Sequence, residues 1–179
     1  MATGDVFRGA SRWVLRHAWE LGVVLRGVSA ICCLLIHVSI ARVAIAAISA
    51  GPSIESLILP LVLLGFVALL SLPWNGIETT TVLLRHGIGM PASVAITSDV
   101  LLCMCYTAVS AAIATHVLTN ASEWYFFSNG TDYTDSVAPR FNQMALALAI
   151  TEAALHLFLV AVTCCGIHNR KKERRFIEK

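Results

Sequence analysis

The sequence predicts an all-α protein, an integral membrane four-helix bundle with antiparallel helices. Hydrophobic residues make up 57% of its 179 residues, and charged residues make up only 13%. The mean hydropathy is +0.74, whereas a soluble domain normally has about 25% charged residues. Four apolar stretches approach or exceed the roughly 20 residues that a membrane-spanning helix needs. We therefore expect one membrane domain, residues 21–167, without a separate soluble domain.

The first expected span covers about residues 21–50 and carries three ionisable residues, Arg26, His37 and Arg42. Such residues inside a span normally face a partner or a water-filled cavity. At about 100° per residue, Arg26 and His37 lie within about 20° of each other, and Arg42 lies about 160° from Arg26. This helix is therefore expected to contact neighbours on two sides. The stretch far exceeds the core of a signal peptide, so we expect no cleavage.

The second expected span, about residues 57–74, has no ionisable residue, and its bulky side chains predict the most lipid-exposed helix. The sequence Pro-Trp-Asn-Gly at 73–76 is expected to end it, because proline and glycine interrupt helices. Residues 75–91 then form an inner loop, within which 79–84 offer the alternative of a continued second helix beyond the membrane. The third expected span, about residues 92–118, contains Asp99.

The fourth expected span, about residues 144–167, places Glu152 and His156 four residues apart, on one helix face. Cys164 and Cys165 end this span beside a basic tail, residues 168–179. Cysteines at a membrane edge are candidates for reversible palmitoylation. The other interpretation is that these two cysteines are small core residues. It applies to all six cysteines, because all of them lie in apolar stretches.

The distribution of Lys and Arg predicts the orientation, because these residues mark the cytoplasmic side of spans. The N-terminal segment 1–20 and the tail are basic, whereas the outer loops 51–56 and 119–143 contain Arg140 as their single basic residue. Four spans place both termini on one side, so we expect both to be cytoplasmic. The outer loop 119–143 contains two glycosylation sequons, at Asn120 and Asn129.

The depths of the buried charges predict two pairs. With a rise of about 1.5 Å per residue, Arg26 and Asp99 lie about 8 and about 12 Å from the inner edge. Arg42 and Glu152 each lie about 12 Å from the outer edge. We therefore expect Arg26 to pair with Asp99 in the inner half of the membrane, and Arg42 to pair with Glu152 in the outer half.

Two interpretations of these charges are open. In the first, the pairs specify which helices are neighbours, because a charge left alone in lipid is costly. In the second, Glu152, His37 and His156 titrate along a proton or ion path. A path needs polar residues that continue to both surfaces, and the sequence shows no continuous series.

An arginine in the first span and an aspartate early in the third span carry a family resemblance. Arg26 in VVLRGVSA and Asp99 in TSDVLLCMCYTAVSAA, with four spans and inside termini, resemble the MARVEL-like superfamily. The similarity is greatest to its Casparian strip membrane protein branch and to related uncharacterised fungal-type membrane proteins, and it covers about residues 21–167. Arg42, Glu152 and the sequons are outside that pattern. The resemblance implies a non-enzymatic protein that organises membrane domains, assists vesicle trafficking or membrane apposition, and self-associates laterally.

The sequence contains no Gly-rich phosphate loop, no G-x-S-x-G motif and no clustered Cys/His set. Glu152 and His156 supply only two metal ligands, fewer than a metal site needs. We therefore expect no enzyme, catalytic residue, metal, cofactor or nucleic-acid partner. The expected partners are the bilayer of the plasma membrane or endomembranes, anionic headgroups at the basic termini, and further copies or other membrane proteins. The alternative is a small oligomeric channel or a proton or ion transporter.

Overall fold

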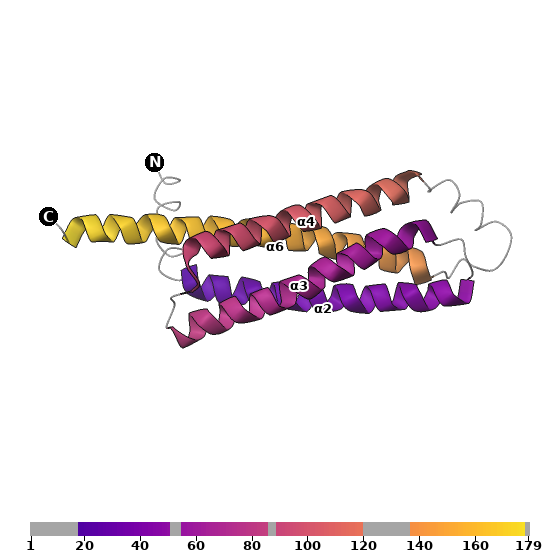
Figure 1. The fold of residues 1–179 in the computed structure, drawn as a ribbon, viewed down its shortest axis with the longest axis horizontal. Coiled ribbons are helices and arrows are strands. Elements are labelled where there is room, and N and C mark those ends of the chain that lie inside the picture. The colour runs from indigo at the N-terminus through magenta and orange to yellow at the C-terminus, as the bar shows by residue number, and fades with distance from the viewer. Residues whose placement is uncertain (1–17, 51–54, 86–88, 120–136, 178–179) are drawn as a thin grey trace, which may run out of the picture.

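The computed structural model describes residues 18–50, 55–85, 89–119 and 137–177 of the chain. Four long helices account for almost all of this part: α2 (Ala18–Ala50), α3 (Glu55–Leu84), α4 (Ala92–Thr119) and α6 (Val137–Ile177). The helices run alternately in opposite directions (Figure 1), so α2 begins and α6 ends at the same end of the bundle. We call this the terminal end. The predicted all-α antiparallel bundle is confirmed.

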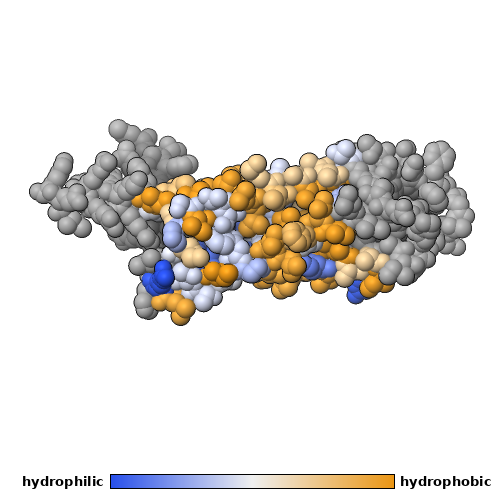
Figure 2. Space-filling view, viewed as in Figure 1, coloured by the Kyte–Doolittle hydropathy of each residue, from blue (hydrophilic) through white to orange (hydrophobic). Residues whose placement is uncertain are grey.

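Each helix contains a segment that is long and apolar enough to cross a membrane. These segments are Trp19–Arg42, Pro60–Leu84, Ala92–Thr115 and Gln143–Ile167. A helix satisfies its own backbone hydrogen bonds, which hydrocarbon requires of any spanning segment. Apolar side chains cover much of the described middle of the bundle on the face shown in Figure 2. The chain is therefore a multi-pass membrane protein in contact with bilayer lipid.

The helices pack as a closed ring, in which α2 and α4 each contact both α3 and α6. The pairs α2–α4 and α3–α6 therefore face each other across the two diagonals. An apolar core fills the half of the bundle away from the terminal end, as the positions of its members along the antiparallel helices show. Its buried members are Cys33, Ile36, Leu61, Leu64, Val67, Ala68, Tyr106, Ile113, Ala145 and Ala149.

Several boundaries differ from the predicted ones. Helix α3 does not end at Trp74 but continues through Pro73 to Leu84. The missing N–H of Pro73 removes one backbone hydrogen bond, which membrane helices tolerate. Helix α6 extends beyond its candidate span Gln143–Ile167 at both ends, from Val137 to Ile177. The first candidate span ends at Arg42 rather than near residue 50.

The most lipid-exposed helix is α4, and the prediction of this role for the second span is wrong. In the most apolar window of α4, 22% of the residues are buried, against 33% in each of the other three helices. Asn75 and Glu78, in the continued part of α3, are both buried. The sequence predicts an inner loop for both residues, whereas they lie on the inward face of a continued helix.

Candidate functional site

A buried ion pair joins α2 to α4 across one diagonal of the bundle. Arg26 Nη2 donates to Asp99 Oδ2 over 2.8 Å, and Arg26 Nη1 donates to Asp99 Oδ1 over 3.2 Å. Asp99 is fully buried and Arg26 is almost so. Parallel hydrogen bonds between a guanidinium and a carboxylate are among the strongest side-chain contacts. The predicted Arg26–Asp99 pair is thus present.

Asp99 is also contacted from the other two helices. The indole Nε1 of Trp74 donates to Asp99 Oδ1 over 3.0 Å, and Nδ1 of His156 lies 3.1 Å from the same oxygen. The guanidinium carbon of Arg26 lies 5.6 Å from the centre of the Trp74 ring, in cation–π geometry. All four helices therefore meet at one carboxylate.

Asn75 connects this ion pair to a second set of polar groups. Its Oδ1 accepts a hydrogen bond from Arg26 Nη1 over 3.2 Å. Its Nδ2 donates to Ser29 Oγ over 2.8 Å and to Ser71 Oγ over 3.2 Å. Ser71 Oγ in turn lies 3.1 Å from His156 Nε2. This last contact joins α3 to α6 across the second diagonal, so both diagonals are bridged by polar side chains.

Glu152 lies at the other edge of this cluster and is fully buried. Ser29 Oγ donates to Glu152 Oε2 over 2.7 Å, and His156 Nε2 lies 3.6 Å from the same oxygen. Glu152 Oε1 has no hydrogen-bond partner within the described part of the chain. The Tyr106 ring stacks on His156, with centroids 5.9 Å apart. We call the whole set the polar network: Arg26, Ser29, Ser71, Trp74, Asn75, Asp99, Glu152 and His156.

The predicted pair of Arg42 with Glu152 is wrong. Arg42 is exposed at the end of the first candidate span, whereas Glu152 bonds Ser29, which lies about 20 Å before Arg42 along α2. The wrong assumption was the end of the first span. The candidate span of α2 ends at Arg42 rather than near residue 50, so Arg42 lies at the edge of the span. Glu152 lies about 14 Å inside the start of its own span at Gln143, close to the expected depth.

Other predicted site residues lie apart from the polar network or outside the described residues. His37 is partly buried, and its Nδ1 lies 2.8 Å from the carbonyl oxygen of Cys33 in its own helix. It lies about 16 Å along α2 from Arg26, so it does not join His156. Cys164 and Cys165 are exposed and free. The sequons at Asn120 and Asn129 lie outside the described residues.

Sequence reasoning missed four members of the polar network. Ser29 lies three residues after Arg26, so it faces nearly the same direction. Ser71 and Asn75 are four residues apart on α3, and Trp74 stands beside them. Uncharged polar residues inside a span often bond neighbouring helices. Ser29 and Ser71 lie within predicted spans, so their polarity already indicates contacts with neighbouring helices. Asn75 lies in the predicted turn 73–76, where a polar residue indicates no such contact.

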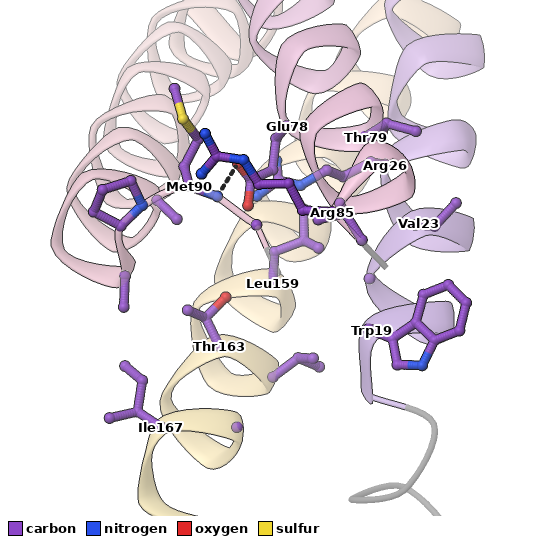
Figure 3. Close-up of a pocket in the computed structure, with 18 residues that line it drawn as sticks. Trp19, Val23, Arg26, Glu78, Thr79, Arg85, Met90, Leu159, Thr163 and Ile167 are labelled. Carbon is purple, nitrogen blue, oxygen red and sulfur yellow. Dashed lines mark hydrogen bonds between the residues drawn. The ribbon is translucent and has the colours of Figure 1, made fainter. Parts of the chain in front are cut away.

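A pocket of about 430 Å³ opens at the terminal end of the bundle. Figure 3 shows Arg26, Arg85 and Glu78 gathered at one end of this pocket, and Trp19, Thr163 and Ile167 at the other. Glu78 Oε2 accepts a hydrogen bond from the backbone N–H of Met90 over 3.1 Å, which ties α3 to the segment before α4. Arg26 thus lines this pocket and also belongs to the polar network.

The polar network contains one arginine, two carboxyl groups and one histidine, with no group among the described residues arranged to hold a metal ion. Comparisons with protein-family models, curated proteins and solved structures gave no match to this chain. The findings therefore describe a four-helix protein with four candidate membrane spans and identify no family. The MARVEL-like resemblance, carried by Arg26 and Asp99, stays a prediction.

Proposed function

We propose that this protein is a non-enzymatic membrane organiser of the MARVEL-like kind, which clusters membrane domains or assists trafficking and membrane apposition by lateral self-association. The observation that carries this proposal is that the polar side chains of the spans are bonded mainly to one another at the centre of the bundle. Such a network fixes the arrangement of four helices without offering a reactive group to a substrate. The outer faces remain free for contacts within the bilayer.

The face of α4 that points away from the bundle supports the lateral contact. Small exposed side chains follow one another at helical spacing along it: Cys105, Thr107, Ala108, Ala111 and Ala112. Small residues let membrane helices approach closely, which supplies van der Waals contact that lipid does not replace. Because α4 is also the least buried helix, it is the face that we assign to a second copy.

The apolar core favours this role over the channel or transporter alternative. It fills the described half of the bundle beyond Glu152, with Ile36, Leu64 and Ile113 fully buried. An ion that crossed the bundle would meet no charged side chain in this core, where the buried polar groups are the hydroxyls of Ser39, Tyr106 and Ser110. Such a passage is costly, because a few hydroxyl groups do not replace the water around an ion. The basic termini are assigned to the cytoplasmic side, where they meet anionic headgroups.

The test is self-association of the full chain in lipid vesicles, measured by energy transfer between labelled copies at low protein-to-lipid ratio. Replacing Ala108 and Ala112 by leucine should reduce the transfer several-fold, because bulky side chains separate the helices. The matched control is Ala154→Leu, an exposed alanine on α6, which should leave the transfer unchanged. Equal transfer in the α4 variant and the wild type would contradict the assigned face, and no transfer in the wild type would contradict self-association.

A further inference from the structure

The hydrogen-bond directions in the polar network determine where its protons lie. The guanidinium of Arg26 can only donate, so Asn75 must turn its Oδ1 toward Arg26. The amide N–H groups of Asn75 then donate to Ser29 and Ser71. Each serine hydroxyl accepts from Asn75 and has its own proton left to donate. The amide orientation of Asn75 is thus set by Arg26, whose guanidinium can only donate.

The same reasoning sets the state of His156. Ser71 Oγ lies 3.1 Å from His156 Nε2, and its proton is free to be donated there, which makes Nε2 the acceptor in the arrangement that we propose. The ring proton then lies on Nδ1 and is donated to Asp99 Oδ1 over 3.1 Å. In this arrangement the His156 ring carries a single proton.

The charges of the polar network then leave Glu152 without a counter-ion. Arg26 and Asp99 neutralise each other, and His156 is neutral. Ser29 donates to Glu152 Oε2, and Oε1 has no partner among the described residues although Glu152 is fully buried. An ionised carboxylate in such a place costs far more than a protonated one. A proton on Glu152 Oε1, the oxygen without a hydrogen-bond donor, would remove this cost of burying a charge.

We propose that Glu152 is a proton-binding site in the membrane interior, with the proton carried on Oε1 and His156 held neutral beside it. The groups that face Glu152 from the neighbouring helices are few. Helix α2 presents Arg26, already bound to Asp99, and the Cys32 and Cys33 thiols, which interact electrostatically with Glu152. Helix α4 presents Asp99 and Tyr106, and α3 presents the uncharged Ser71 and Asn75. The polar groups nearest to Glu152 are the Ser29 hydroxyl at 2.7 Å, the Cys33 thiol and the His156 ring at 3.6 Å. Of these three, His156 is the group that ordinarily exchanges a proton near neutral pH.

This site does not depend on the proposed lateral role, since a bundle that fails to self-associate could still bind the proton. Replacement of the two carboxyl groups of the polar network by amides should have different effects. Asp99 forms an ion pair with Arg26, so asparagine at position 99 leaves the charge of Arg26 without a counter-ion. Glu152 is already neutral, so glutamine at 152 reproduces its shape and its lack of charge.

The experiment is infrared spectroscopy of the full chain in lipid vesicles at about neutral pH, with and without carbon-13 labelling of glutamate. We expect a protonated carboxylic acid band that shifts with the label in the wild type, disappears in Glu152→Gln and persists in Glu78→Gln. Nitrogen-15 resonances of His156 should report the neutral ring with its proton on Nδ1. A wild type without a labelled acid band, or a band that Glu152→Gln retains, would overturn the proposal.

Thermal stability supplies a second, independent readout. Glu152→Gln should melt close to the wild type, whereas Asp99→Asn should melt at a clearly lower temperature. A Glu152→Gln variant that is destabilised as much as Asp99→Asn would show that Glu152 is ionised and would overturn the proposal. An imidazolium signal from His156 without the acid band would place the proton on the histidine instead, and would also overturn it.

Discussion

Arg26 on α2 and Asp99 on α4 are bound across a diagonal of the bundle by hydrogen bonds of 2.8 and 3.2 Å. The backbones of these helices scarcely touch each other, so the long arginine side chain supplies the link. Loss of one partner leaves a buried, uncompensated charge, which costs about 3–5 kcal/mol. Asp99→Asn and Arg26→Gln should each lower the free energy of unfolding in mixed micelles by about this amount.

Exchange of the two charges gives a more specific test of the ion pair. The double variant Arg26→Asp with Asp99→Arg should be more stable than either single exchange, because opposite charges again face each other. It should remain below the wild type, since Trp74 donates an N–H to position 99, and an arginine there cannot accept it. A double variant no more stable than the single ones would show that the two charges do not interact.

Asn75 should be the most sensitive uncharged member of the polar network, because it bonds Arg26, Ser29 and Ser71 at once. Asn75→Ala should lower the free energy of unfolding by about 1–2 kcal/mol, the range for interhelical hydrogen bonds in membranes. The control is Gly76→Ala on the same helix, where an added Cβ meets nothing within 4 Å. Equal unfolding of the two variants would argue against the role of Asn75.

Gly89 should tolerate no side chain, because an added Cβ would collide with Glu78 Oε1 and lie 3.1 Å from Val82 Cγ2. Glu78 is nearly buried and also holds the backbone N–H of Met90, so it cannot move without losing that bond. We expect Gly89→Ala to lower the free energy of unfolding by about 1–3 kcal/mol, as overpacking does. Gly22→Ala, where the space is open, should change it little.

Acyl exchange after hydroxylamine treatment tests palmitoylation at the terminal end. Cys164 and Cys165 are exposed there, and we expect them to carry a hydroxylamine-sensitive acyl group that Cys164→Ser with Cys165→Ser removes. Cys105→Ser, an exposed cysteine in the middle of α4, is the control and should leave the signal intact. No signal from the wild type in cells would mean that the two cysteines are not acylated there.

Protease protection tests the predicted orientation. Protease added outside intact cells should leave the C-terminal tail uncut, because its cluster of Lys and Arg predicts a cytoplasmic tail. Cleavage should appear only after the membrane is permeabilised, with an epitope on the tail as the readout. A tail that is clipped in intact cells would reverse the orientation and would also exclude use of the two sequons.

The fold and the first ion pair could be predicted from the sequence because hydropathy, length and two opposite charges at one depth are enough for them. The partner of Glu152 could not be predicted, because the apolar residues after Arg42 hide the end of the first span, which lies at Arg42 itself. The position of Asn75 inside the bundle could not be predicted, because Pro73 normally indicates the end of a helix. Within a membrane bundle the helix tolerates this proline and continues. The sequence offers His156 as a possible titrating group, but its bond to Asp99 depends on the rotation of α4 and α6, which only the packed structure shows.

The central claim is that the polar network fixes the bundle and does not conduct. The most direct test is proton and ion flux into liposomes that contain the purified, folded chain, beside a Glu152→Gln control. The account predicts no flux above protein-free liposomes in either sample, since the apolar core closes the bundle beyond Glu152. Flux through the wild type that the control loses would contradict it and would make Glu152 and His156 parts of a transport path.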